Sequence, residues 1–207
     1  MKFITYEHRH ALTILNSKEY LYIWGEIHNI LNGITEEEIM KEFLNGGDKR
    51  GKSISKSLNT IIKSKLVGKN WQIESPIFKE KDYLDDTWRL DFAKESISIE
   101  VGFNHGSVVA WNLLKPVLAS ELNHVEKAIQ TQIAIVITAT NQLKKTGGFD
   151  NAVGSYEKYI QYLKPLNMQL TVPTLIIGLE GLEKYYISHE KDPITNKKIG
   201  IVNKVIV

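Results

Sequence analysis

The 207-residue sequence contains no cysteine, and no apolar run in it is long enough to cross a membrane. The absence of cysteine excludes disulfides, thiolate zinc sites and cysteine nucleophiles, and it fits a reducing compartment. The first residues, Met1-Lys2-Phe3-Ile4, do not form the apolar core of a signal peptide. We therefore expect a soluble cytoplasmic protein with no membrane partner and no small-molecule cofactor.

The sequence also lacks an excess of charge of one sign. It has 26 Lys and Arg residues against 24 Asp and Glu residues, a net charge of +2. The protein as a whole is therefore not strongly attracted to a polyanion, and any nucleic-acid-binding face must come from local clustering. Basic residues do cluster, at Lys49, Arg50, Lys52, Lys56, Lys63, Lys65 and Lys69, and again at Lys144 and Lys145. A solvated surface and a phosphate-binding surface both fit these clusters.

Helical periodicity dominates the first third of the chain. Between Ser17 and Leu31, apolar residues recur at intervals of three and four residues, as in an amphipathic helix. Ser17 is a candidate N-cap of this helix, and Gly33 a candidate C-terminal end. Thr35 opens a second helix with capping-box chemistry, and residues 54–67 form a third that ends at Gly68. Further on, we expect helices over residues 107–118, interrupted by Pro116, over 123–128 and over 151–166, with a loop at 141–148.

Strand patterns appear from the middle of the chain onward. Pro76 indicates an edge strand at 73–76, and the continuous apolar runs 133–138 and 172–179 are typical of strands buried on both faces. Residues 183–207 resemble a hairpin extension. With no repeat and no linker, the chain is predicted to be a single domain, 1–207, with an α/β core, a mixed sheet flanked by helices and a helical N-terminal part.

Two acidic residues lie at a spacing that suits a metal site. Asp91 ends one apolar run, and Glu100 lies nine residues later in Ile97-Ser98-Ile99-Glu100-Val101. Alternation puts Glu100 on the face opposite to the three apolar residues. Two paired strands would present both carboxylates to one Mg²⁺, which prefers oxygen ligands. The alternative is an ordinary turn Asp and a Glu on the solvated face of a strand.

Several short segments, in order, resemble the BglII and BstYI group of type II restriction endonucleases, in the PD-(D/E)xK nuclease superfamily. The likeness runs to about Gly181. The matching segments are Trp24-Gly25-Glu26-Ile27, Ser57-Leu58-Asn59, Lys69-Asn70-Trp71, Asp91-Phe92, Glu100-Val101, 133–138, Ser155-Tyr156-Glu157, Val172-Pro173 and Ile176-Ile177-Gly178-Leu179. The resemblance implies a restriction-endonuclease-like fold and Mg²⁺-dependent, sequence-specific hydrolysis of double-stranded DNA that leaves 5′ phosphates. A homodimer on a palindromic, GATC-containing site is implied as well.

The resemblance also assigns roles to individual residues. Asp91 and Glu100 correspond to metal-binding carboxylates, Val101 to a backbone-carbonyl ligand, and Glu74 to a residue near the metal that could accept a proton from water. An exposed Glu on an edge strand is the alternative for Glu74. DNA contacts are implied for Asn104, His105, Ser107, Lys115, Lys144, Lys145, Asp150 and Asn151.

The chain departs from the family pattern at Gly102, where the group usually has Gln and the wider superfamily Lys or Glu, beside the attacking water. Two interpretations are open. A glycine could slow hydrolysis without preventing it, or the chain could be a non-catalytic or partner-dependent DNA-binding subunit of a nuclease. A third hypothesis is an unrelated α/β binding protein in which Asp91 and Glu100 have no joint role.

Overall fold

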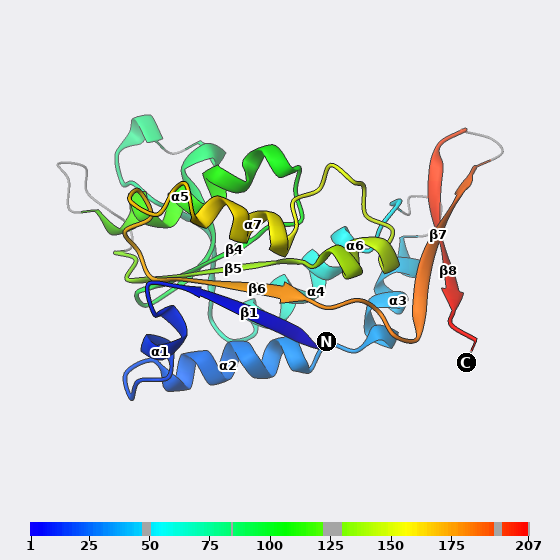
Figure 1. Cartoon of the computed structure of the whole chain (residues 1–207), viewed down its shortest axis with the longest axis horizontal. Coiled ribbons are helices and arrows are strands. Elements are labelled where there is room, and N and C mark those ends of the chain that lie inside the picture. The colour runs from blue at the N-terminus through cyan, green and yellow to red at the C-terminus, as the bar shows by residue number, and fades with distance from the viewer. Residues whose placement is uncertain (47–50, 84, 122–129, 193–195, 207) are drawn as a thin grey trace.

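A mixed sheet crosses the middle of the molecule (Figure 1). The computed structural model describes residues 1–46, 51–83, 85–121, 130–192 and 196–206, and within them six strands follow the order β1-β6-β5-β4-β3-β2. Strands β4, β5 and β6 are parallel, and the other neighbours are antiparallel. The strands are β1 (Phe3–His8), β2 (Gln72–Pro76), β3 (Arg89–Lys94), β4 (Ile97–Val101), β5 (Ile133–Ala139) and β6 (Thr174–Leu179).

Helices cover both faces of this sheet (Figure 1). On one side lie α1 (Ala11–Leu15), α2 (Leu21–Asn32), α3 (Glu36–Asn45) and α4 (Ser55–Val67), and on the other α5 (Val109–Ser120) and α7 (Tyr156–Leu163). Along β4 and β5, Ile97, Ile99 and Ile135 face the first group, whereas Ala134 and Val136 face the second. The predicted α/β fold with a mixed sheet between helices is confirmed, and the central strands are apolar throughout because both faces are covered.

Three element boundaries lie where local sequence signals predict them. The Thr35 hydroxyl accepts a hydrogen bond from the Glu38 backbone N–H (3.1 Å) and caps α3. Gly68 is the C-cap of α4. Pro76, which cannot donate a backbone hydrogen bond, is the last residue of the edge strand β2.

Other boundaries differ from the predictions. Ser17 is not an N-cap: its carbonyl accepts from the N–H groups of Tyr20 and Leu21 in a turn, and α2 begins at Leu21. Pro116 lies inside α5 without ending it. The predicted loop at 141–148 contains helix α6 (Asn141–Thr146), because the Thr140 hydroxyl caps it. The helix expected from residue 151 begins at Tyr156, after the N-cap Ser155.

Some elements were not predicted, and some predictions lie outside the described residues. Strand β1 and helix α1 have no counterpart among the predicted elements, nor do the short 3₁₀ helices Lys81–Tyr83 and Asp86–Trp88. The helix predicted over 107–118 begins as the 3₁₀ helix Gly106–Val108, which leads into α5. The predicted helix 123–128, the basic residues Lys49 and Arg50, and residues 193–195 of the C-terminal segment are not among the described residues.

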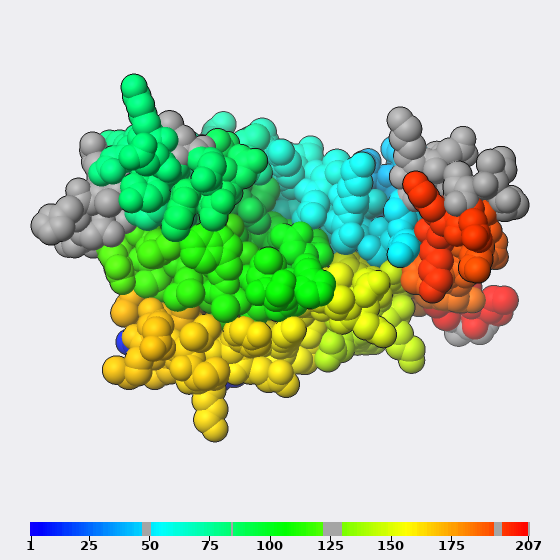
Figure 2. Space-filling model, turned by 90° about the horizontal axis from the view of Figure 1, so that it is seen from above, coloured from blue at the N-terminus to red at the C-terminus, as the bar shows by residue number. Residues whose placement is uncertain are grey.

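Strands β7 (Tyr185–Lys191) and β8 (Lys198–Lys204) form a separate antiparallel sheet at one end of the molecule (Figure 2). The Gly200 N–H donates to the carbonyl of Gly51 (3.2 Å), and the His189 ring bonds the carbonyls of Lys52 and Gly148. This sheet therefore packs against the segment that leads into α4. Among the described residues, no helix has both the length and the apolar character needed to span a membrane.

Candidate active site

Asp91 and Glu100, here called the acid pair, lie where strands β3 and β4 separate. Their pairing ends at Phe92 and Ile99. Beyond it, the Asp91 N–H donates to Glu100 Oε1 (3.4 Å), and the Val101 N–H donates to Asp91 Oδ2 (2.8 Å). Each carboxylate thus satisfies a backbone donor that the strand pairing leaves free. As a result, both carboxylates are held at the same end of the two strands, as the sequence spacing predicts.

Lys115 joins this pair from helix α5. Its ammonium forms an ion pair with Glu100 Oε2, lies 3.9 Å from Asp91 Oδ1 and donates to the Arg89 carbonyl (3.0 Å). The Lys115 side chain is only 9% exposed. It therefore lies within the acid pair and not on the exposed surface. The DNA contact that the resemblance implies for Lys115 stays a prediction.

Glu100 is buried, which the pattern of β4 does not predict. Only 1% of the residue is exposed, because α5 and α7 cover the face of the sheet that the polar residues of β4 occupy. Burial, and then the negative charge of Asp91, raise the pKa of Glu100 to about 8, against the opposing effect of Lys115. Lys115 therefore offsets only part of the effect of burial and of the neighbouring carboxylate on Glu100.

The donor set fits a divalent cation. Two carboxylates from neighbouring strands meet at one point, and hard oxygen ligands of this kind suit Mg²⁺. Among the described residues, no three His, Cys, Asp or Glu side chains gather into a group that could hold a metal by themselves. Mg²⁺ sites often have this composition, with one or two carboxylates completed by substrate phosphate and water.

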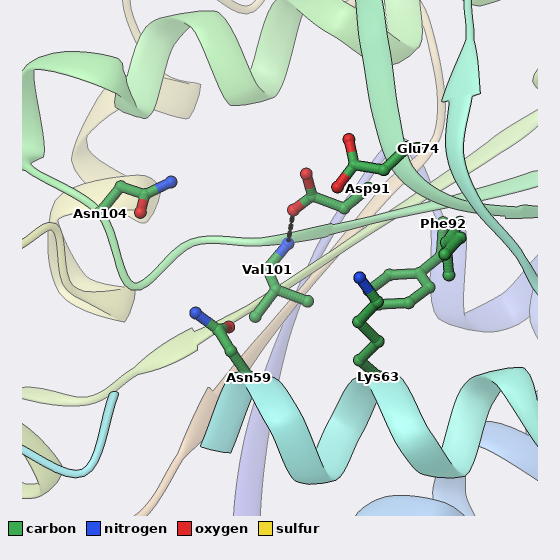
Figure 3. A pocket seen from close by; sticks show the side chains of 8 residues that line it. Asn59, Lys63, Glu74, Asp91, Phe92, Val101 and Asn104 are labelled. Atoms are coloured by element: carbon green, nitrogen blue, oxygen red, sulfur yellow. Dashed lines mark hydrogen bonds between the residues drawn. The ribbon is translucent and has the colours of Figure 1, made fainter. Parts of the chain in front are cut away.

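Asp91, the more exposed member of the acid pair, lines a cleft of about 260 Å³ (Figure 3). Glu74 on β2 lines it beside Asp91, and Glu74 has a left-handed backbone (φ 48°) inside the strand. Such a backbone is strained for a residue other than glycine, and strain of this kind is concentrated at functional sites. The cleft is lined by Asn59, Lys63, Ile73, Glu74, Asp91, Phe92, Val101 and Asn104.

Asn59 and Lys63 form the wall of the cleft opposite the acids (Figure 3). Both are exposed residues of α4. The sequence places neither of them near the acid pair. Their spacing of four residues, which puts them on one face of the helix, is the signal that could have linked them.

Two loops beside the cleft are joined through their backbones. His105 and Val153 form an isolated bridge, the Gly154 N–H donates to the Asn104 carbonyl (2.9 Å), and the Gly106 N–H donates to the Ala152 carbonyl (2.7 Å). The residues proposed for DNA contact at 104–107 and at 150–151 thus belong to one surface.

The side chains of this surface fall into two groups. Three of them support the loops: His105 Nδ1 accepts from the Ser107 N–H (3.2 Å), Asp150 accepts from the Ala152 N–H (2.9 Å), and the Lys144 ammonium donates to the carbonyls of Asn151 and Val153. Burial lowers the pKa of Lys144, whereas the hydrogen bond from Ala152 lowers the pKa of Asp150. Asn104, Lys145 and Asn151 are exposed.

Two of the matching sequence segments meet away from the acids. Trp71 Nε1 donates to Glu26 Oε1 (2.7 Å), and Lys94 forms an ion pair with the same carboxylate (2.9 Å). Trp24 and Trp71 are buried in the core. These residues hold α2 against the edge of the sheet and take no part in the cleft.

Gly102 has no room for a side chain. A Cβ atom built there would lie 2.3 Å from the hydroxyl oxygen of Tyr159 and 2.9 Å from its Cζ. Tyr159 is fully buried, and its hydroxyl accepts a hydrogen bond from Asn112 Nδ2 (2.8 Å). Burial, more than any neighbouring charge, raises the pKa of this phenol. A residue of α7 therefore fills the space that a side chain at position 102 would use.

A mixed sheet between helices, with two carboxylates at one strand end beside a cleft, is an arrangement that suits a nuclease. The family model for restriction endonuclease BglII/BglIII matches residues 3–179, so the chain belongs to this family of type II site-specific deoxyribonucleases. Two solved structures share the fold. BglII complexed with a DNA 16-mer is 24% identical, with a TM-score of 0.68 over 100% of this chain and 92% of that one. Free BglII is 22% identical, with a TM-score of 0.54 over 100% and 96%. A search among curated proteins found no significant match.

Proposed function

We propose that this chain is a Mg²⁺-dependent restriction endonuclease that cuts both strands of DNA at a specific sequence and leaves 5′ phosphates. The observation that carries the proposal is the acid pair, in which Asp91 and Glu100 lie at one strand end beside a cleft. Family membership supports DNA as the substrate, and the structurally similar BglII was crystallised with a DNA 16-mer.

The residues of the site suit phosphodiester hydrolysis. Asp91 and Glu100 would hold the metal, and the backbone carbonyl of Val101, a residue that lines the cleft, would complete the ligand set. When bound, the metal supplies a nucleophilic water and stabilises the charge that develops on the phosphate and on the leaving 3′ oxygen. Attack by water forms the new P–O bond as the bond to the 3′ oxygen breaks. Glu74, across the cleft from α4, could accept the proton that the water loses.

We propose that DNA binds across the cleft and the paired loops. Asn104 and Asn151 are exposed amides, a side-chain type that pairs with adenine edges, and Lys145 is an exposed cation suited to phosphate. One acid pair per chain cuts one strand, so cutting both strands of a palindrome calls for a homodimer with twofold symmetry. A GATC-containing target and a cytoplasmic location belong to the same proposal.

The direct test is digestion of unmethylated plasmid and phage DNA by the purified chain, with Mg²⁺ and with EDTA, followed by sequencing of the fragment ends. Discrete fragments with 5′ phosphates, formed only with Mg²⁺, are expected. DNA that stays intact with Mg²⁺ over a range of protein concentrations would contradict the proposal and favour the non-catalytic or partner-dependent subunit.

A further inference from the structure

Gly102, the residue directly after β4, stands where the resemblance implies the third residue of the family motif. The side-chain space at Gly102 is occupied by the Tyr159 ring, and Asn112 on α5 holds the Tyr159 hydroxyl. A Gln, Lys or Glu at position 102 would collide with a buried ring rather than extend toward the acids. Any third group must therefore reach the acid pair from another element.

Helix α5 supplies such a group one turn after Asn112. Lys115 is the only charged residue in the 12-residue α5, and it lies on the buried side of this helix, where a charge is costly unless it is paired. Its partners are the two proposed metal ligands: Glu100 in direct contact and Asp91 Oδ1 at 3.9 Å. An ammonium has three N–H donors, and here one contacts Glu100 and one the Arg89 carbonyl. These two contacts leave the third N–H unassigned, and Asp91, whose Oδ1 lies 3.9 Å from the ammonium, lines the cleft.

We propose that Lys115 is the third catalytic group, delivered by α5 in place of a side chain at position 102. Its remaining N–H donates to the attacking water and to the scissile phosphate. This inference rests on the proposed endonuclease function. It also gives Gly102 a role, because a glycine leaves room for Tyr159 and for the packing of α5 and α7 on the sheet.

Lys115→Met is the first test, because methionine keeps most of the length and removes the ammonium. We expect single-turnover cleavage to slow by about 100-fold or more, the usual range for loss of a proton-handling group. The affinity of the DNA-free variant for Mg²⁺, measured by calorimetry, should stay the same or rise several-fold, because the Lys115 cation no longer repels the metal. A purely structural role for Lys115 predicts that Mg²⁺ affinity falls together with cleavage.

Lys94→Met is the matched control. Lys94 also pairs with a half-buried glutamate, Glu26, but it lies outside the cleft. Both substitutions leave a carboxylate without its cation, so both should lower the melting temperature. Only Lys115→Met should stop cleavage while Mg²⁺ still binds.

The absence of cysteine allows a sharper test. In Lys115→Cys the new thiol is unique in the chain, so alkylation in denaturant with 2-bromoethylamine, followed by refolding, restores an ammonium at the length of lysine. Alkylation with 1-bromopropane gives a side chain of equal length without charge. We expect the aminoethyl form to recover at least about tenfold more activity than the propyl form. Wild-type protein taken through the same treatment controls for refolding.

Equal activity of the two alkylated forms, or cleavage by Lys115→Met within about threefold of wild type, would overturn the assignment of Lys115. The wild-type protein in the same assay separates this failure from failure of the proposed function. If wild type cuts DNA and the variants cut equally well, only the role of Lys115 is wrong. If wild type does not cut, the endonuclease function itself is wrong.

Discussion

The acid pair and the paired loops, which are joined through residues 104–106 and 152–154, are neighbouring regions built in opposite ways. At the acid pair, charged side chains contact each other: Glu100 is buried, and Lys115 is bonded to it. In the loops, the backbones contact each other through residues 104–106 and 152–154, while Asn104 and Asn151 extend into solvent. Charge is fixed in the first region, and polar surface is displayed in the second.

This difference follows from what each region would have to do. A hydrolytic site benefits from preorganised charge in a low-dielectric setting, where each interaction is stronger than in water. A surface that distinguishes base sequences needs exposed donors and acceptors on a backbone rigid enough to keep them in register. Substitutions in the first region should therefore alter the rate of hydrolysis, and substitutions in the second should alter DNA affinity.

The largest effect is expected from the carboxylate that faces the cleft. Asp91→Ala should reduce Mg²⁺-dependent cleavage by about 10³-fold or more, since a metal contributes several kcal/mol of charge stabilisation and each 1.36 kcal/mol is a factor of ten. DNA affinity measured with EDTA should be unchanged or tighter, because a phosphate no longer meets this negative charge.

Asp86→Ala is the matched control for that variant. Asp86 is an acid five residues upstream with a side chain that is 96% exposed, and it should leave cleavage unchanged. Full activity in Asp91→Ala would mean that the acid pair is not the active site, and the contrast between the two regions would then have no basis.

A smaller effect, on stability, tests the packing behind the acid pair. Gly102→Ala should lower the free energy of unfolding by about 1–3 kcal/mol, because its Cβ collides with Tyr159. Gly25→Ala, inside α2 where no atom lies within 4 Å of the added Cβ, should raise it by about 0.5–1 kcal/mol. Denaturant unfolding of the two variants measures both values. A stable and more active Gly102→Gln would show instead that the motif position is usable.

How far the sequence predicts this site depends on the range of the interaction. The nine-residue spacing of Asp91 and Glu100 is local, so the strand pairing and the meeting of the two acids could be predicted from it. The burial of Glu100 could not, because alternation tells which residues share a face but not which helix covers that face. Strand β1 was missed for a similar reason: its partner, β6, lies about 170 residues away.

The sequence shows that Lys115 is unusual in its helix, but it does not show which residue Lys115 contacts. A lysine that is the only charged residue of a helix needs a partner once its side of the helix is buried. The sequence does not identify that partner, because the contact between Lys115 and Glu100 depends on how α5 packs on the sheet. The occupation of the Gly102 space by Tyr159 is likewise a tertiary fact, and it makes the departure at Gly102 a steric requirement rather than a simple loss.

The smallest effect is expected from two adjacent lysines in the second region. Lys145 is exposed, whereas the Lys144 ammonium is bonded to two carbonyls of the loop. Lys145→Ala should weaken binding about equally for specific and non-specific DNA, and should reduce the slope of log affinity against log salt by about 1, the loss of one phosphate contact. Filter binding at several salt concentrations measures this slope.

Lys144→Ala should act differently, because it removes a support of the loop rather than a cation presented to DNA. We expect it to reduce the preference for the specific sequence, as Asn151 is no longer held in place, and to leave the salt slope unchanged. The reverse result, with a lower salt slope for Lys144→Ala and none for Lys145→Ala, would mean that the Lys144 ammonium leaves the loop carbonyls when DNA binds. In that case DNA binding rearranges the paired loops, and only the acid pair is preorganised.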